Sequence, residues 1–197
     1  MGGTVAGPSW TSRLSSLTGL DRGELPLWAL PVTGAIAGLL HHGIDLSDTS
    51  LNLPGHHGLE LMAALVFSRL ASTRPWAALC AVTGTIGTDL ALTSDFLHGL
   101  KHVPTYALTA VLVDAAFRLA GARGRGWWVP ALIGGLAHVA KPLFFLGVAL
   151  VTGMTFGFMR HGPVFPLVTH FSFGAVGAVC GAVLARGWVS CARGRGG

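Results

Sequence analysis

The chain has 197 residues, of which 51% are hydrophobic and only 11% are charged. Soluble domains carry about 25% charged residues, so this composition excludes an ordinary soluble domain and predicts a protein whose surface is largely covered by lipid. The net charge of +5 does not indicate a nucleic-acid partner, because the basic residues follow the pattern of a membrane protein.

The apolar segments predict an all-α integral membrane protein. We expect residues 1–25, rich in Gly, Ser and Thr, to form a cytoplasmic N-terminal segment without a cleavable signal peptide. A membrane-spanning helix needs about 20 mostly apolar residues. Residues 26–187 contain six such segments, at 26–43, 57–73, 76–94, 103–120, 127–152 and 163–186. Residues 188–197 are expected to form a basic cytoplasmic tail.

The lysines and arginines predict the orientation of these helices. With the N-terminus in the cytoplasm, the outer loops hold only Lys101 and Arg160, and Lys141 lies inside the fifth segment. The other 10 of the 13 basic residues fall on the inner side. This bias is the positive-inside pattern. We therefore expect a multi-pass protein of the cell (inner) membrane with both termini in the cytoplasm.

Small residues recur at close spacing in several of the predicted helices. Gly34 and Gly38 stand four residues apart in the first segment, with Ala35 between them. Such spacing lets helices approach closely in lipid. The pattern leaves two uses open, which are packing within the chain and docking of a partner membrane protein.

The most polar part of the predicted membrane domain is the loop between the first two helices. The pairs His41-His42 and His56-His57 bracket a stretch that contains Asp45 and Asp48 and is followed by Glu60. In the predicted topology these side chains lie at the outer ends of two apolar helices. Ionisable groups in a bilayer are costly and normally face a cavity or a partner.

The remaining histidines also avoid the cytoplasmic half of the predicted topology. Carboxylates partly follow them, since only Asp114 lies in the inner half, where we expect it to pair with Arg118 one turn later. We predict a shared outward-facing site for a ligand. Its candidate residues are His41, His42, Asp45, His56, His57, Glu60, Asp89, His98, His102, Tyr106, His138, Lys141 and His170.

Imidazoles together with carboxylates are typical of two kinds of site. Neutral imidazole suits Ni, Co, Cu and Zn ions, and haem iron takes axial histidine. The ligand is therefore open between a transition metal, haem and another small molecule. The candidate metal ligands are His41, His42, His56, His57, His98 and His102.

The sequence lacks the motifs of several enzyme classes. It contains no GxSxG serine motif and no GxxxxGK[ST] phosphate-binding loop. We therefore expect no hydrolase or ATPase activity, and transport driven by ATP needs separate subunits.

Three stretches carry a resemblance to a known family. PTYALTAVLVDAAFRL (104–119) is an apolar helix that ends in Asp and Arg at the cytoplasmic side, and TGTIGTDLAL (83–92) and FGAVGAVCGAVLARG (173–187) are rich in glycine. With its size and predicted topology, the chain resembles the substrate-binding (S) components of energy-coupling factor transporters, which are ABC importers.

The resemblance implies a function and a set of partners. It implies that the chain captures a vitamin, cofactor precursor or metal ion from outside. It also implies docking, through Gly34, Ala35 and Gly38, to a coupling transmembrane subunit and ATPase subunits. The many histidines favour a metal ion or a metal-containing cofactor over a plain aromatic vitamin.

Other functions remain open from the sequence. One is a haem- or metal-binding electron-transfer protein, with His138 and His170 as the best pair of axial ligands. Others are a membrane enzyme that uses His and Asp for acid–base work and a structural or assembly factor.

Overall fold

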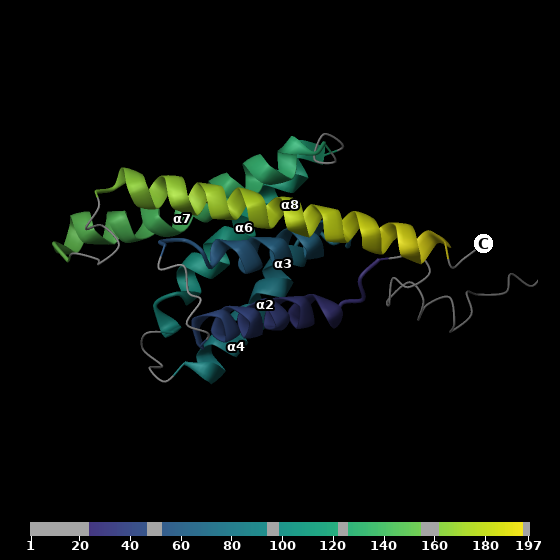
Figure 1. The fold of residues 1–197 in the computed structure, drawn as a ribbon, viewed down its shortest axis with the longest axis horizontal. Helices are drawn as coiled ribbons and strands as arrows, with labels where there is room; N and C mark the ends of the chain where they lie inside the picture. Colours follow the sequence, from purple (N-terminus) through teal and green to yellow (C-terminus); the bar gives the residue numbers. More distant parts are fainter. Residues whose placement is uncertain (1–23, 47–52, 94–98, 122–125, 155–161, 195–197) are drawn as a thin grey trace, which may run out of the picture.

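The computed structural model describes residues 24–46, 53–93, 99–121, 126–154 and 162–194, which form an all-α protein (Figure 1). This part of the chain confirms the predicted six helices, although residues 1–23 lie outside it. The helices are α2 (Ala29–Leu46), α3 (Gly58–Leu70), α4 (Ala77–Leu92), α6 (Val103–Ala120), α7 (Trp128–Thr152) and α8 (Val164–Gly194).

The helices differ in whether they can cross a membrane by length and composition. Three of the described helices, α6, α7 and α8, are long and apolar enough to do so. By contrast α3 has only 13 residues, or about 20 Å of helix. The last helix continues to Gly194, so most of the expected C-terminal tail is helical in the structure.

The short helix α3 is the centre of the bundle. It contacts every other described helix, and α7 and α8 lie side by side along one flank while α2 and α4 lie along the other (Figure 1). Its side chains Met62, Leu65 and Val66 are completely buried in the main apolar cluster. Any polar residue on α3 is therefore positioned by the whole bundle.

Successive helices run in opposite directions, so the bundle has two distinct ends. At one end the backbone N–H of Leu25 donates to the Ala71 carbonyl over 2.8 Å, and Ala185 of α8 joins the same apolar cluster as Leu25. At the other end His41, at the end of α2, lies beside His57, at the start of α3. The described beginning and end of the chain therefore share one end, and the paired histidines lie at the opposite one.

Glycines allow α2 and α4 to pack backbone against backbone. A methyl group at Gly34 would overlap the carbonyl oxygen of Ala81, and one at Gly84 would overlap that of Pro31. Gly38 packs on Thr88, with 2.8 Å from its ideal Cβ position to the Thr88 Cβ. Gly34 and Gly38 of the expected docking face are thus buried against α4 of the same chain, so packing within the chain explains their spacing, and docking through this face stays a prediction.

The structure corrects the expected pairing of Asp114. The buried Asp114 carboxylate accepts hydrogen bonds from the backbone N–H groups of Ala78 (3.1 Å) and Leu79 (2.9 Å) in the first turn of α4. It also lies 3.6 Å from Nε of Arg69, whereas Arg118 is exposed. A carboxylate stabilises the N-terminal end of a helix because the first N–H groups have no partner within the helix.

Replacing Asp114 by alanine is expected to lower the free energy of unfolding by about 1–3 kcal/mol, because it removes a helix cap and leaves the half-buried Arg69 without its counter-charge. Unfolding in mixed detergent micelles measures this change. The matched control is Arg118→Gln, which is expected to cost less than about 0.5 kcal/mol. A larger loss of stability in Arg118→Gln would contradict this assignment and would indicate that Asp114 pairs with Arg118.

Candidate metal centre

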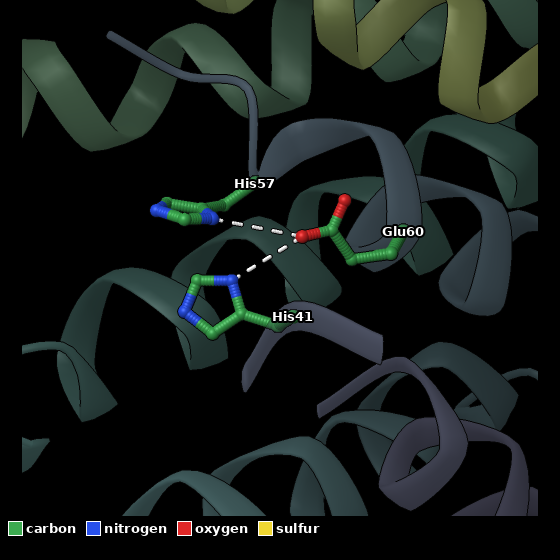
Figure 2. Close-up of side chains that lie close together, drawn as sticks. All are labelled: His41, His57 and Glu60. Carbon is green, nitrogen blue, oxygen red and sulfur yellow. Dashed lines mark hydrogen bonds and ion pairs between the residues drawn. The ribbon is translucent and has the colours of Figure 1, made fainter. Parts of the chain in front are cut away.

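Three side chains from two helices meet at the polar end of the bundle (Figure 2). Nδ1 of His41 lies 3.2 Å from Oε1 of Glu60, and Nδ1 of His57 lies 3.6 Å from the same oxygen. The rings of His41 and His57 are 3.7 Å apart between centroids. Two imidazoles therefore point at one carboxylate oxygen, and we call His41, His57 and Glu60 the metal triad.

The local sequence explains this geometry. His57 immediately precedes α3 and Glu60 lies in its first turn, so the two residues share one helix face at a spacing of three. A carboxylate in the first turn is favoured by the helix dipole. His41 comes from the last turns of α2, which runs antiparallel to α3 and ends beside its start.

The metal triad borders a small cavity shared by four helices. Its other lining residues are Ala37 of α2, Leu61 of α3, Thr85 of α4 and Tyr106 of α6. The space has room for about one water molecule or one metal ion. This size suits an ion, and it is too small for a vitamin in the present arrangement.

The donor set of the metal triad fits a first-row transition ion. One atom from each residue can be chosen such that all three lie within 4.8 Å of one another. Imidazole nitrogen suits Zn, Ni, Co and Cu, whereas hard ions such as Mg and Ca prefer oxygen alone. An ion that took these three atoms as ligands would replace the contact between Nδ1 of His41 and Oε1 of Glu60, which lie 3.2 Å apart.

Two further predicted residues form a separate pair beside the metal triad. Nε2 of His42 lies 3.2 Å from Oδ1 of the buried Asp89. The ring of His42 is 5.3 Å from that of His41 between centroids. Asp89 therefore contacts His42, the sequence neighbour of His41. Among the described residues it belongs to no group of three possible metal ligands.

His56 adjoins the metal triad but is directed elsewhere. Its Nδ1 lies 2.7 Å from the carbonyl of Leu53, where the ring N–H donates. Its ring centroid is 3.7 Å from that of His57. His56 and His57 are adjacent in the sequence, but His57 is directed at Glu60 whereas His56 is directed at the Leu53 carbonyl.

Another group of predicted residues surrounds Tyr106, on the α6 side of the cavity. Nζ of Lys141 lies 5.3 Å from the centroid of the Tyr106 ring. The ring of His102 is stacked at 5.9 Å from that of Tyr106. Lys141 and His102 therefore adjoin the cavity through Tyr106.

His138 and His170 form a buried pair between α7 and α8. Their rings are stacked with centroids 5.0 Å apart and an interplanar angle of 29°. Axial ligands hold a haem between them with both nitrogens directed at the iron, and stacked rings in contact leave no room for a porphyrin. The residues present therefore do not fit the haem site expected from the sequence.

The remaining predicted site residues cannot be placed. His98 lies outside the described residues. Asp45 belongs to the last turn of α2, but its side chain is also outside the described part of the structure. Their predicted roles in ligand binding stay predictions.

Sequence reasoning missed residues whose role arises only from packing. Ala37, Leu61 and Thr85 line the cavity but are ordinary residues of apolar helices. The Thr85 hydroxyl donates to the Gly34 carbonyl over 2.9 Å, which joins α4 to α2 next to the cavity. No local signal distinguishes such residues, because only the helix rotations bring them together.

Comparison with protein-family models, with curated proteins and with solved structures gives no match for this chain. The resemblance to S components of energy-coupling factor transporters therefore stays a prediction.

Proposed function

We propose that this chain is a membrane-embedded protein that binds one divalent first-row transition ion at His41, His57 and Glu60. The observation that carries the proposal is the convergence of two imidazoles and one carboxylate on a cavity of ion size. Three protein ligands leave a coordination position for water or an exchanging group. An ion held in this way can be taken up and released.

The surface of the bundle supports a membrane location. Large apolar side chains are exposed along the helices, for example Leu136 of α7 and Leu184 of α8, each 59% exposed. Exposed apolar surface of this extent needs a covering, and lipid provides it for helices as long and apolar as α7 and α8. The metal triad then lies in a bundle surrounded by lipid.

The proposed biological role is substrate capture for an importer of the energy-coupling factor type. Six helices, both described chain ends at one end of the bundle and a metal triad at the opposite end support this role. The arginine distribution favours cytoplasmic termini, so the triad opens outward. A coupling transmembrane subunit and ATPase subunits are the implied partners.

Ion selectivity tests the metal-binding function. Metal-stripped protein in detergent is titrated with Zn²⁺, Ni²⁺ and Co²⁺, and separately with Mg²⁺ and Ca²⁺, in competition with a chromophoric chelator. We expect one transition ion per chain and no competition from the two hard ions, because imidazole is a poor ligand for them. Equal affinity for Mg²⁺, or no binding of any transition ion, would contradict the proposal.

The importer role has its own test. The tagged chain is purified from its native membrane in mild detergent, and its partners are identified by mass spectrometry. We expect a coupling membrane subunit and an ATPase in stoichiometric amounts. Recovery of the metal-binding chain alone would refute the importer role while leaving the metal site intact.

A further inference from the structure

The turn that carries His57 rests on the buried rings of His138 and His170. The turn is closed by two backbone hydrogen bonds, from the His56 N–H to the Leu53 carbonyl (3.3 Å) and from the Gly58 N–H to the Gly55 carbonyl (2.8 Å). On the side of α2 the turn contacts His41 through the ring of His57. The two buried rings support it from the side of α7 and α8.

Two glycines let the backbone of the turn approach these rings. Gly55 has φ of +86°, a conformation that side chains disfavour, and its ideal Cβ position is 2.7 Å from Cγ of His170. A methyl group at Gly58 would overlap the ring of His138. Gly55, two residues before His57, and Gly58, directly after it, therefore pack on the two rings and leave no space for a side chain.

The rings themselves are held in place. His170 donates from Nδ1 to the Pro166 carbonyl over 2.7 Å, which fixes its orientation, and His138 stacks on it. His138 is only 1% exposed, and its ring lies against the backbone of Gly55. Both rings are therefore fixed in the positions against which the turn packs.

His138 also lies at a weak point of α7. Pro142 is inside this helix, and a proline has no N–H to donate to the carbonyl four residues earlier, which is that of His138. Helices bend most readily at such a site. A bend of α7 there displaces the ring of His138 relative to the turn.

We infer that His138 and His170 are positioning residues for the metal triad, and that they hold His57 in place through Gly55 and Gly58. This inference rests on the proposed metal-binding function. It links the packing of α7 and α8 to ion affinity, because both rings move with those helices. The two residues touch the turn and are not themselves ligands.

Zn²⁺ affinity of single variants is the first test. Gly58→Ala and His138→Ala are each expected to raise the Zn²⁺ Kd about 10-fold or more while leaving one ion per chain, as removal of outer residues does at other metal sites. The matched control is Gly147→Ala in α7, where an added methyl group meets nothing within 4 Å. Circular dichroism checks the fold, and His138→Phe, which keeps a flat ring, replaces His138→Ala if the latter misfolds.

The effect must act through His57. In a His57→Ala background, His138→Ala is expected to change the Kd less than twofold, because the side chain that it positions is gone. In the double variant Gly58→Ala/His138→Ala, the new methyl group occupies space that the ring has left, so the Kd is expected to lie closer to the wild-type value than in either single variant. An equal loss of affinity with and without His57 would overturn the inference.

Failure of the inference differs from failure of the proposed function. If the wild-type chain binds Zn²⁺ and His138→Ala, His138→Phe and Gly58→Ala all leave the Kd within twofold, the positioning role is wrong and the metal triad stands. If the wild-type chain binds no Zn²⁺, both fail together.

Discussion

Replacing Glu60 by glutamine is expected to raise the Kd for Zn²⁺ about 100-fold or more, because the variant loses the only anionic ligand of the metal triad. Changes in the surroundings of metal ligands already cost about 10–100-fold, and loss of a ligand costs more. His41→Ala and His57→Ala are expected to have effects of the same order, since each removes one imidazole. Competition titration against a chelator measures all three.

The chain offers a matched control for the carboxylate. Glu24 lies at the opposite end of the bundle, where its Oε2 accepts a hydrogen bond from the Thr73 hydroxyl over 2.9 Å. Glu24→Gln keeps an acceptor oxygen and removes a charge, as Glu60→Gln does. We expect its Kd to remain within twofold of the wild-type value, and an equal loss in both variants would point to a general charge effect instead of a site.

Replacing Gly84 by alanine is expected to lower the free energy of unfolding, because the glycine lies where α2 and α4 pack backbone against backbone. The added methyl group would overlap the Pro31 carbonyl oxygen, and main-chain atoms of a packed helix move only if α2 and α4 separate. Overpacking of this kind costs about 1–3 kcal/mol, and we expect the upper part of that range. The measurement is the free energy of unfolding in mixed micelles.

Gly87, one turn further along α4, provides the control. A methyl group there meets nothing within 4 Å, and alanine is the better helix former by about 0.5–1 kcal/mol. Gly87→Ala is therefore expected to leave stability unchanged or to raise it. If Gly84→Ala is no less stable than Gly87→Ala, the close α2–α4 crossing is wrong.

The sequence predicts the helices well because apolar runs interrupted by proline and glycine limit where helices can form. Pro26 and Pro75 stand shortly before the starts of α2 and α4. The end of α8 is less predictable, because Arg193 and Arg195 indicate a tail by charge, while the structure continues the helix through Arg193 to Gly194.

The candidate site is predictable in part, for a reason of chain geometry. His41, His57 and Glu60 flank one loop, so any antiparallel arrangement of the first two helices brings them close. Which other polar residues join them depends on helix rotation, which periodicity alone does not determine. The sequence places His138 and His170 only among the candidate ligand residues, and the structure shows that they pack on each other beside the turn.

The pairing of Asp114 shows the same limit. Its sequence neighbour Arg118 is one turn away, so local spacing favours that pair. The structure instead uses Asp114 to cap α4 and to contact Arg69. Tertiary contacts between helices override a local pair when they satisfy backbone groups that have no other partner.

The most direct test of the metal triad is X-ray absorption spectroscopy at the Zn edge on protein loaded with one equivalent of Zn²⁺. We expect a shell of nitrogen and oxygen ligands at about 2.0–2.1 Å, with the outer-shell scattering of two imidazoles. His41→Ala and His57→Ala should each reduce that scattering to one imidazole. A shell of oxygen alone, or a sulfur ligand at about 2.3 Å, would contradict the assignment of His41, His57 and Glu60 as the metal centre.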